Sequence, residues 1–499
     1  MAVETELKLR IAPEHLSRLK RHPLLKTLAT TRATTCKLHN IYYDTPKLEL
    51  HKSAMALRLR RAGRQWLQTL KGGGEVQAGL HQRNEWETPV AGEALDFAAL
   101  EASGAKRLPH TMRKKLQPVF VTDFSRNSRM LAFEGAEVEL CMDSGEIRAG
   151  RLTRPISELE LELKSGEPAQ LFRLALALLD IVPLEVEHTS KAEQGYRLFA
   201  RAKPAVTKAA TPDLAKCSDV PCALQAMIWS CLFHLQANVP GAVHKLDDEY
   251  LHQVRVALRR LRVVLGMAKI SRADDDLAAL HKDVAALCVE LGRSREWDVF
   301  TTQTLAQARA HLHAHAGLRN VLSASLKLRE QQHAKVRDAL QSQDFQRLLL
   351  RCGAWMHGDY WREPAAEGGL TLPRFAAQIL EKRSKQVGKR GRKLAGADTS
   401  QLHALRIACK KLRYSAELLA PLHAGAKAKR YLSALAPVQD TLGMLNDIAV
   451  ARRLLEELDN AARHEMLILI RGWIEHDFAE QMAALGKAWK RFAGQKAFW

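Results

Sequence analysis

Two strand-like segments, near the two ends of the first 200 residues, carry their charges on one face. They span Val3–Arg10 and Ser157–Lys164. Side chains alternate across a β-strand. The charged positions that share a face are therefore Glu4, Glu6 and Lys8 on the first segment and Glu160, Glu162 and Lys164 on the second. Acidic groups beside basic ones favour a site that binds a divalent metal and a polyanion together, as phosphate-anhydride chemistry requires.

The same alternation recurs through residues 1–200. It is found at 56–60, 66–71, 82–87, 119–126, 136–143 and 184–187. Two helices are expected, over 13–21 and 168–180, the second from an apolar run. We expect turns at Gly72-Gly73-Gly74 and at Asp143-Ser144-Gly145, because glycine and aspartate favour turn conformations. The first part of the chain is thus predicted to be mainly β.

Charges of both signs share the faces of several of these strands. Besides the two opening segments, the charged pairs and triplets are Arg58/Arg60, Arg83/Glu85, Glu137/Glu139/Asp143 and Glu185/Glu187. One such strand alone is best explained by an antiparallel sheet with an ordinary solvated face. Because so many strands repeat the pattern, we favour a closed barrel whose charged lumen surrounds one polyphosphate.

The two signs have separate tasks in such a lumen. Glutamate oxygens suit Mg²⁺ or Mn²⁺ as ligands, and a second ion could hold the attacking water. Arginine and lysine would neutralise the remaining phosphate oxygens as the anhydride breaks. The sequence contains no G-x-x-x-x-G-K-[ST] loop, which disfavours a P-loop mechanism.

Net charge points to a polyanionic partner and places it in the second part of the chain. The 499 residues carry a formal charge of +21, which favours nucleic acid, anionic lipid or a phosphate polymer as partner. The first 200 residues hold 30 Lys and Arg against 25 Asp and Glu, whereas the remainder holds 46 against 30. The second part is therefore the more basic one.

Cysteine usage and hydropathy indicate an ordinary intracellular protein. The eight cysteines form no C-x-x-C pair, so reduced structural thiols are favoured over a zinc site. The first residues are charged and lack the apolar core of a signal peptide, and no uninterrupted apolar run reaches the ~18 residues of a membrane helix. We expect a cytoplasmic protein without a membrane partner, associated with polyphosphate granules if its basic part binds that polymer.

A linker and an internal repeat divide the chain. Residues 201–216 are rich in Pro, Ala and Lys without an apolar period, so we expect domains at 1–200 and 217–499. Beyond the linker, residues 251–262 match 402–413 at an offset of 151, and the same offset relates 291–292 to 442–443. Two blocks with one offset indicate a duplicated, pseudo-symmetric α-helical bundle with halves of about 217–365 and 366–499.

Each repeat presents a basic stripe beside an apolar one on a helix. The two stripes are His252, Arg255, Arg259 and Arg262, and His403, Arg406, Lys410 and Arg413. One such helix would be explained by a solvated face and a core histidine. Duplication of the stripe in a basic domain favours binding of successive phosphates. Each histidine could titrate toward the anion or hydrogen-bond Glu296 or Asp447, and both readings stay open.

Aromatic content separates two kinds of polyanion. Aromatic residues make up 6% of the chain and are not interleaved with the basic stripes, so stacking platforms for bases are missing from the pattern. Inorganic polyphosphate therefore fits better than nucleic acid.

These motifs resemble two known domain families. The run Glu4-x-Glu6-x-Lys8, followed by Tyr43-Asp44-Thr45 and Arg58-x-Arg60, is similar to the CYTH domain of the triphosphate tunnel metalloenzymes. Residues 201–499, with His252-x-x-Arg255 and its copy at His403, resemble the CHAD domain, a conserved-histidine α-helical domain. The combination resembles the bacterial CYTH–CHAD inorganic triphosphatases. One position departs from the pattern, because Glu296 stands where aspartate is expected, as at Asp447 in the second repeat.

The resemblance implies a fold and a set of site residues. The fold would be α+β, an eight-stranded antiparallel tunnel followed by the helical bundle. The implied metal ligands are Glu4, Glu6, Asp143, Glu160 and Glu162. The implied triphosphate ligands are Lys8, Arg58, Arg60, Lys71, Arg83, Arg126, Lys164 and Lys191. Catalysis would depend most on Glu4, Glu6, Lys8, Asp143 and Lys191. The two basic stripes of the helical domain would bind polyphosphate.

The leading hypothesis is hydrolysis of inorganic triphosphate to pyrophosphate and phosphate, with two Mg²⁺ or Mn²⁺ ions. Adenylate cyclase and thiamine triphosphatase activity on the same fold stay open, because each substrate presents a triphosphate to similar residues. A non-catalytic polyphosphate-binding or granule-targeting protein is a third reading, although a pure anion binder gains nothing from its acidic strand positions. The sequence shows no coiled-coil seam, and we predict no oligomeric state from it.

Overall fold

The computed structural model describes residues 2–77, 79–245, 247–271, 274–311, 316–361, 370–394, 396–423, 425–459 and 463–499. The chain forms two compact units, each described separately below. The first comprises Met1–Ala205 together with Gln341–Glu363, and the second comprises Val206–Leu340 with Pro364–Trp499.

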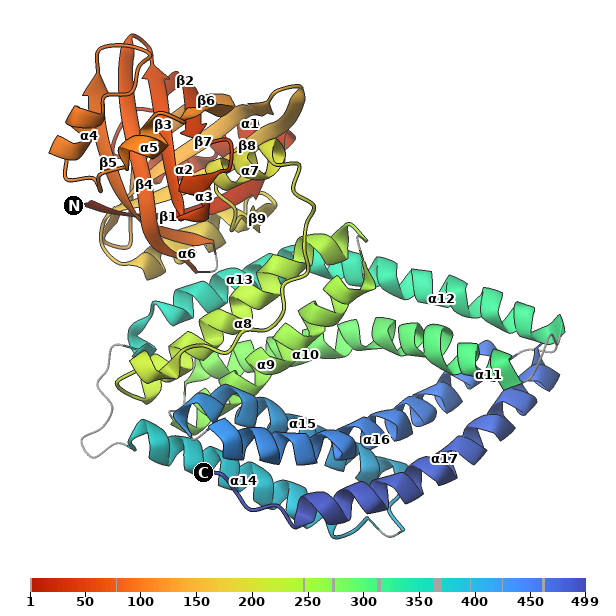
Figure 1. Ribbon diagram of the computed structural model, residues 1–499. Coiled ribbons are helices and arrows are strands. Elements are labelled where there is room, and N and C mark those ends of the chain that lie inside the picture. The colour runs from red at the N-terminus through yellow and green to blue at the C-terminus, as the bar shows by residue number, and fades with distance from the viewer. Residues whose placement is uncertain are drawn as a thin grey trace. The chain divides into compact units, whose positions relative to one another are not determined.

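The first unit is a closed antiparallel β-barrel (Figure 1). Its strands are β1 (Ala2–Ile11), β2 (Thr34–Asp44), β3 (Met55–Ala62), β4 (Gln65–Gln77), β5 (Leu80–Val90), β6 (Gln117–Phe133), β7 (Ala136–Ala149), β8 (Leu152–Ser165) and β9 (Leu184–Val186). The order around the barrel is β5-β4-β3-β2-β6-β7-β8-β1, and pairing of β1 with β5 closes it. The short β9 adds to the far end of β1. The predicted eight-stranded tunnel is therefore confirmed, with one additional short strand.

Alternation along the strands separates the lumen from the core. On β1 and β8 four leucines at odd positions are fully buried, namely Leu7, Leu9, Leu159 and Leu161. Helix α6 (Pro168–Leu179) packs on both strands and buries its own apolar face there. The even positions of the same strands carry the charges and face the barrel interior. Burial of the leucine face therefore fixes the register that turns the carboxylates inward.

Short helices complete the first unit. They are α1 (Pro13–Arg21), α2 (Pro23–Leu28), α3 (Glu49–Lys52), α4 (Phe97–Ala102), α5 (His110–Arg113) and α7 (Lys191–Phe199). The expected helix over 13–21 matches α1, and the one over 168–180 matches α6 to within one residue. Helix α7 packs against β6, β7 and β8.

The two glycine-containing turns expected from sequence are instead parts of strands. Gly72 to Gly74 lie inside β4, where the register with β5 shifts between Gly72 and Glu75. Gly145 lies inside β7 opposite Phe124, and a Cβ atom at Gly145 would approach the Asp123 carbonyl oxygen to 2.1 Å. Glycine in a strand marks a bulge or a close backbone approach, so these turn predictions were wrong.

A helix from the middle of the chain belongs to the barrel unit. Helix α13 (Gln343–Met356) packs on α6 and β9, with Gly353 directly against the Phe172 ring. The Gln346 side chain accepts a hydrogen bond from the Val186 backbone N–H at 2.9 Å. Arg347 pairs with Asp180 at 2.7 Å. This placement differs from the expected domain limits, which assign the segment to 217–499.

The second unit is all α-helical (Figure 1). Its helices are α8 (Val220–Val243), α9 (Asp248–Ser271), α10 (Asp275–Val299), α11 (Leu305–His311), α12 (Ala316–Gln341), α14 (Leu372–Gly391), α15 (Thr399–Leu419), α16 (Gly425–Leu458) and α17 (His464–Ala493), with a π-helical turn at Phe300–Thr304. The repeat seen in the sequence maps α9 onto α15 and α10 onto α16. In both halves the repeat helix packs against the helices before and after it in its own half.

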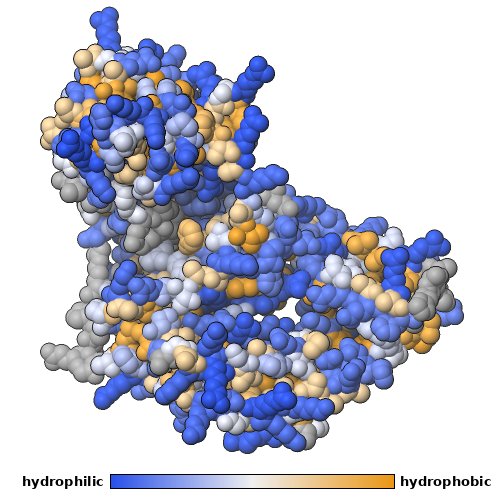
Figure 2. Space-filling view, viewed as in Figure 1, coloured by the Kyte–Doolittle hydropathy of each residue, from blue (hydrophilic) through white to orange (hydrophobic). Residues whose placement is uncertain are grey.

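Among the described residues, one helix, α8, is long and apolar enough by length and composition to cross a membrane. Of its most apolar window, 56% is buried in the fold, and core helices of soluble proteins pass the same test. Two of its buried polar side chains have protein partners, since His234 bonds Gln253 and Asn238 donates to the Thr207 carbonyl. The visible surface of the helical unit is mainly hydrophilic, with scattered apolar residues (Figure 2).

Candidate active site

A cavity of about 330 Å³ lies inside the barrel, and all eight main strands contribute to its lining. The volume is at the lower end of the roughly 300–1,000 Å³ usual for small-molecule sites. Its charged lining residues are Glu4, Glu6, Lys8, Arg58, Arg60, Lys71, Arg83, Glu85, Glu87, Arg126, Glu139, Glu160, Glu162 and Lys191. The described lining thus holds seven carboxylates and seven cations, and it includes every predicted metal or triphosphate ligand except Asp143 and Lys164. Of the charges that strand parity assigned to the lumen, Glu137, Glu185 and Glu187 are not lining residues.

Strand register places the carboxylates in rows across the barrel wall. Glu6 on β1 is opposite Glu162 on β8, which is opposite Glu139 on β7. One step deeper, Lys8 is opposite Glu160. Lys8 therefore contacts carboxylates of two strands, Glu6 at 2.8 Å and Glu160.

Charge neighbours dominate the protonation of this inner row. Burial alone would lower the pKa of Lys8, but the carboxylates of Glu160 and Glu6 raise it above its usual value. Burial alone would raise the pKa of Glu160, but Lys191, Lys8 and Arg126 hold it well below the usual range. Both groups are therefore charged at neutral pH. Glu160 is the main counter-ion of Lys8, whereas Lys191 is the main counter-ion of Glu160.

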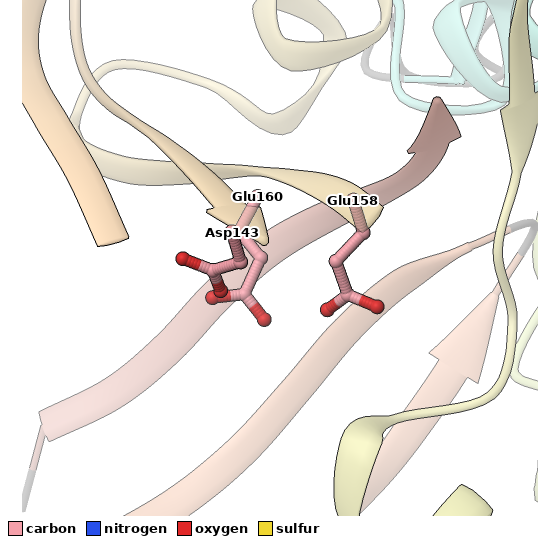
Figure 3. Close-up of side chains that lie close together, drawn as sticks. All are labelled: Asp143, Glu158 and Glu160. Atoms are coloured by element: carbon pink, nitrogen blue, oxygen red, sulfur yellow. The ribbon is translucent and has the colours of Figure 1, made fainter. Parts of the chain in front are cut away.

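A compact group of buried carboxylates lies beside this row. Ligand atoms of Asp143, Glu158 and Glu160 lie within 4.8 Å of one another. Figure 3 shows the three side chains together, Asp143 from β7 and the glutamates from β8. By donor type and spacing this cluster could hold a metal ion.

The opposite wall is mainly cationic. Arg58 bonds Glu85 at 3.2 Å, Arg60 donates to the Asn40 side chain at 2.8 Å, and Lys71 contacts both Glu4 and Glu85. Burial and the nearby Arg58 and Arg126 lower the pKa of Arg60 to about 10. Cations crowd here with too few carboxylates, which favours an anion between them.

A second basic cluster lies in the helical unit. Helices α9 and α15 contact each other, and Arg259 is close enough to Arg406 and Lys410 to lower the pKa of each. Within the described parts of the chain, no ion pair joins any of these three side chains to a carboxylate. The Nε of Arg406 is buried and has no hydrogen-bond partner.

The protonation of this cluster shows that its positive charges repel one another. Burial, then Arg406 and Arg259, lower the pKa of Lys410 from 10.5 to about 6. Burial, then Arg259 and Arg295, lower the pKa of Arg255 to about 9. The two repeats thus bring together cations that form no ion pair with a carboxylate among the described residues, although Asp447 lies near Arg406 and Lys410.

Family comparisons agree with both parts of this description. The CYTH domain model matches residues 2–196, and the CHAD domain model matches residues 226–456. The chain carries a CYTH domain followed by a CHAD domain.

Individual relatives cover the chain to different extents. A protein of Haemophilus influenzae named inorganic triphosphatase is 35% identical over 201 residues, which is 40% of this chain and 56% of that relative. An uncharacterized protein of Mycobacterium tuberculosis is 24% identical over 456 residues, covering 82% of this chain and 81% of its own. The crystal structure of the CHAD domain from the plant Ricinus communis is 29% identical, with a TM-score of 0.49, and covers 59% of this chain and 96% of that structure.

Two of the predicted metal or triphosphate ligands lie outside the cavity lining. Asp143 is fully buried and accepts two hydrogen bonds from Arg126, at 2.8 and 2.6 Å. Lys164 lies at the end of β8, where it contacts Glu139 at 3.0 Å and also Glu162. The structure therefore places Asp143 behind the lining and Lys164 beside the acidic row.

Some site residues escape the sequence analysis. Glu158 lies at the same strand parity as Glu160 and Glu162, so alternation alone could have placed its side chain on the inner face of β8. Asn40 and Ser190 also line the cavity, but neutral polar residues carry no such signal.

The predicted residues of the CHAD domain divide into an inner and an outer set. Arg255 is buried and bonds the carbonyls of Leu291 and Gly292, and with Arg259, Arg406 and Lys410 it forms the inner set. Arg413 instead pairs with Glu417 at 2.6 Å.

The remaining three predicted residues of the stripes also lie outside the inner set. Arg262 is exposed and lies near His281 and Lys411. His403 hydrogen-bonds Asn446 at 3.0 Å, which is the residue before the proposed partner Asp447. For His252, burial and the surrounding arginines lower the pKa.

Proposed function

We propose that the CYTH domain hydrolyses inorganic triphosphate in a metal-dependent reaction, and that the CHAD domain binds polyphosphate. The observation that carries this proposal is the cavity with seven carboxylates and seven cations on a closed barrel. A pure anion receptor has no use for seven carboxylates, whereas a metal–triphosphate complex needs both signs. The Haemophilus influenzae relative supports the reaction, since it is named inorganic triphosphatase.

The carboxylate row of Glu6, Glu162 and Glu139 fits a divalent metal. Burial raises the pKa of Glu162, and the neighbouring carboxylates of Glu4 and Glu139 raise it further, while Lys164 opposes them. Carboxylates that repel one another beside a cavity are suited to bind a cation. With Glu4, these residues would hold Mg²⁺ or Mn²⁺, which neutralises phosphate oxygens and polarises the anhydride.

The remaining cations would hold the triphosphate. Arg58 and Arg60 come from β3 and Arg83 from β5, on either side of β4, and Arg126 and Lys191 also line the cavity. Guanidinium groups bind phosphate oxygens in a bidentate manner and stabilise the charge that develops on the leaving group.

The aromatic residues of the lining favour a substrate without a base. Among the described lining residues, the aromatic side chains are Tyr42 and Phe124. Tyr42 is stacked on Phe120 with ring centroids 4.4 Å apart. Phe124 lies under Lys191 and Arg126, at 5.2 and 5.6 Å from its centroid. Each of the two rings is therefore already in contact with protein groups, which supports inorganic triphosphate over a nucleotide.

The unpaired cations of the CHAD domain support the polyphosphate proposal. Arg259, Arg406 and Lys410 come from both repeats and repel one another. A chain of phosphates would supply the missing negative charges and release bound counterions. The domain would act as a single site built from the two repeats.

The test is phosphate release by the full chain, because the segment at 341–363 belongs to the barrel unit. Inorganic triphosphate, ATP and thiamine triphosphate are compared with Mg²⁺ or Mn²⁺, with and without chelator. We expect fastest release from inorganic triphosphate and loss of activity on chelation. Glu6→Gln should abolish turnover, whereas Glu146→Gln, an exposed carboxylate of β7, should not change it. Activity unaffected by chelator would reject the proposal, and tight triphosphate binding without turnover would favour a receptor.

A further inference from the structure

The ammonium group of Lys191 occupies the centre of the buried carboxylate cluster. Its Nζ contacts Asp143 at 2.7 Å, Glu160 at 3.0 Å and also Glu158. A lysine ammonium has three N–H donors, so these three carboxylates can satisfy all of them. The side chain of Lys191 is 8% exposed, and those of Asp143 and Glu158 are 0% and 6% exposed.

Backbone geometry fixes the carboxylates around that ammonium. Asp143 and Glu158 are direct cross-strand neighbours on β7 and β8. Like charges opposite each other in a sheet are destabilising, so this pair requires a cation beside it. Lys191 supplies that cation from the first residue of α7, whose N-terminus is capped by the Ser190 side chain. Arg126, opposite Asp143 on β6, supplies a second one.

The three carboxylates differ in their access to the cavity. Glu160 and Lys191 line it, whereas Asp143 and Glu158 lie behind them and do not. A group that does not reach the cavity can influence a bound triphosphate only through the residues in front of it.

We infer that Asp143 and Glu158 are positioning residues that anchor the Lys191 ammonium, and that they are not metal ligands. This inference rests on the proposed function of the same cavity. The space between the three carboxylates already holds a cation, and a metal ion there would have to displace a buried lysine that would then lack partners.

The anchor gives Lys191 a specific role toward the substrate. Two of its N–H donors stay on Asp143 and Glu158, and the third can move from Glu160 to a phosphate oxygen. Glu160 is then released toward the cavity. The ammonium thus reaches the triphosphate without losing its orientation, which is the condition for preorganised charge stabilisation.

A double-mutant cycle on the full chain tests the anchor. Glu158→Gln, Lys191→Met and the double variant are compared in kcat and KM for inorganic triphosphate with Mn²⁺. A charge-assisted hydrogen bond corresponds to about tenfold or more in rate or binding. We expect Glu158→Gln to lower kcat/KM about tenfold in the wild-type background and to have no further effect beside Lys191→Met. If the losses in kcat/KM of the two single variants multiply in the double variant, Glu158 acts independently of Lys191, and the inference is overturned.

Binding of Mn²⁺ alone, measured by calorimetry, separates an anchor from a metal ligand. Glu162→Gln is the matched control, because Glu162 lies four residues further along β8 than Glu158 and lines the cavity. We expect Glu158→Gln to keep the Mn²⁺ affinity within about twofold of wild type, and Glu162→Gln to weaken it about tenfold. Loss of Mn²⁺ binding in Glu158→Gln comparable to that in Glu162→Gln would make Glu158 a metal ligand instead.

Two further measurements keep the outcome decisive. Thermal unfolding checks that each variant is folded, and Glu158→Asp, which retains the charge, replaces Glu158→Gln in the cycle if the latter does not fold. If the wild-type chain hydrolyses no triphosphate, the proposed function fails. In that case triphosphate affinity is measured for the same four proteins of the cycle. If the effects of Glu158→Gln and Lys191→Met on this affinity are independent, the role of Glu158 as an anchor is rejected as well.

Discussion

The tunnel and the helical domain both bury positive charge, but they treat it in opposite ways. In the tunnel most inner cations have carboxylate partners, and the described lining contains as many acidic as basic groups. The cations that form such ion pairs are Lys8, Arg58, Lys71, Arg126 and Lys191. The pKa of the buried Lys8 is accordingly raised by Glu160 and Glu6 despite its burial. In the CHAD domain the pKa of Lys410 is lowered to about 6 by burial and by Arg406 and Arg259.

This difference indicates two kinds of anion site. The tunnel is preorganised with internal counter-charges, so the triphosphate proposed to bind there would have to exchange existing ion pairs, and the proposed metal would balance its charge. In the helical cluster of Arg259, Arg406 and Lys410, the basic groups repel one another, and a bound phosphate chain would reduce this repulsion. The tunnel is therefore suited to discriminate and react, and the cluster is suited to retain a polymer of variable length.

Glu160→Ala tests the compensated side and should have the largest effect. It removes a partner of Lys8, Lys191 and Arg126 together. Breaking a buried ion pair costs about 3–5 kcal/mol because the remaining charges are uncompensated. We expect a loss of that size in the free energy of unfolding, measured with denaturant, and at least about a hundredfold loss in kcat. A variant of unchanged stability would contradict the view that the tunnel depends on internal pairing.

Lys410→Met tests the uncompensated side and should change stability in the opposite direction. The lowered pKa of Lys410 means that at pH 7.5 the unfolded chain holds a proton on this lysine that the folded chain lacks. Replacing the lysine removes this difference and should stabilise the chain by about 0.5–1 kcal/mol without polyphosphate. Polyphosphate affinity should fall about tenfold by calorimetric titration. Arg413→Met is the matched control on the same helix, since Arg413 is paired with Glu417 and should give no stability gain. Destabilisation by Lys410→Met would show that the cluster is compensated after all.

The sequence predicted the paired region better than the unpaired one. Strand parity alone assigns Glu4, Glu6, Lys8 and Glu160 to one interior, because period-two alternation converts directly into a face. The same argument covers Glu158, which the predicted site omits. On the helices, a rotation of 100° per residue places Arg413 on the same stripe as Lys410. In the structure, however, Arg413 forms an ion pair with Glu417, one turn further along the helix. Local pairing of this kind is decided by side-chain reach.

Other features depend on tertiary contacts that no local pattern contains. Gly145 reads as a turn residue, yet it is a strand residue because Phe124 requires space opposite it. Helix α13 is amphipathic like the helices on either side of it in the sequence, so its pattern does not show which unit it joins. Its packing against Phe172 on α6 assigns it to the barrel unit. The domain boundary therefore follows packing partners, which a single sequence does not show.

The pH dependence of polyphosphate binding sharpens the comparison further. Lys410 has a folded pKa of about 6 against an ordinary value of 10.5, with Arg406, Arg259, Arg255 and Asp447 as its charged neighbours. The folded chain therefore binds fewer protons than the unfolded chain between these values, so its contribution makes stability rise with pH there. A bound polyanion raises this pKa. We expect uptake of up to about one proton at pH 7.5, measured as heats that differ between buffers of different ionisation enthalpy. Buffer-independent heats, or unchanged uptake in Lys410→Met, would contradict it.

Arg173→Ala should have the smallest effect, and it tests whether burial rather than pairing distinguishes the two regions. Arg173 on α6 pairs with Glu134, and the two side chains are 44% and 46% exposed. Solvent screens such pairs, which contribute about 0–1 kcal/mol at most. We expect a change below about 0.5 kcal/mol in the free energy of unfolding and unchanged triphosphatase kinetics. A loss as large as that of Glu160→Ala would mean that ion pairs stabilise this domain wherever they occur. Burial of the carboxylates and ammonium groups in the tunnel would then not be the reason why their ion pairs stabilise the fold.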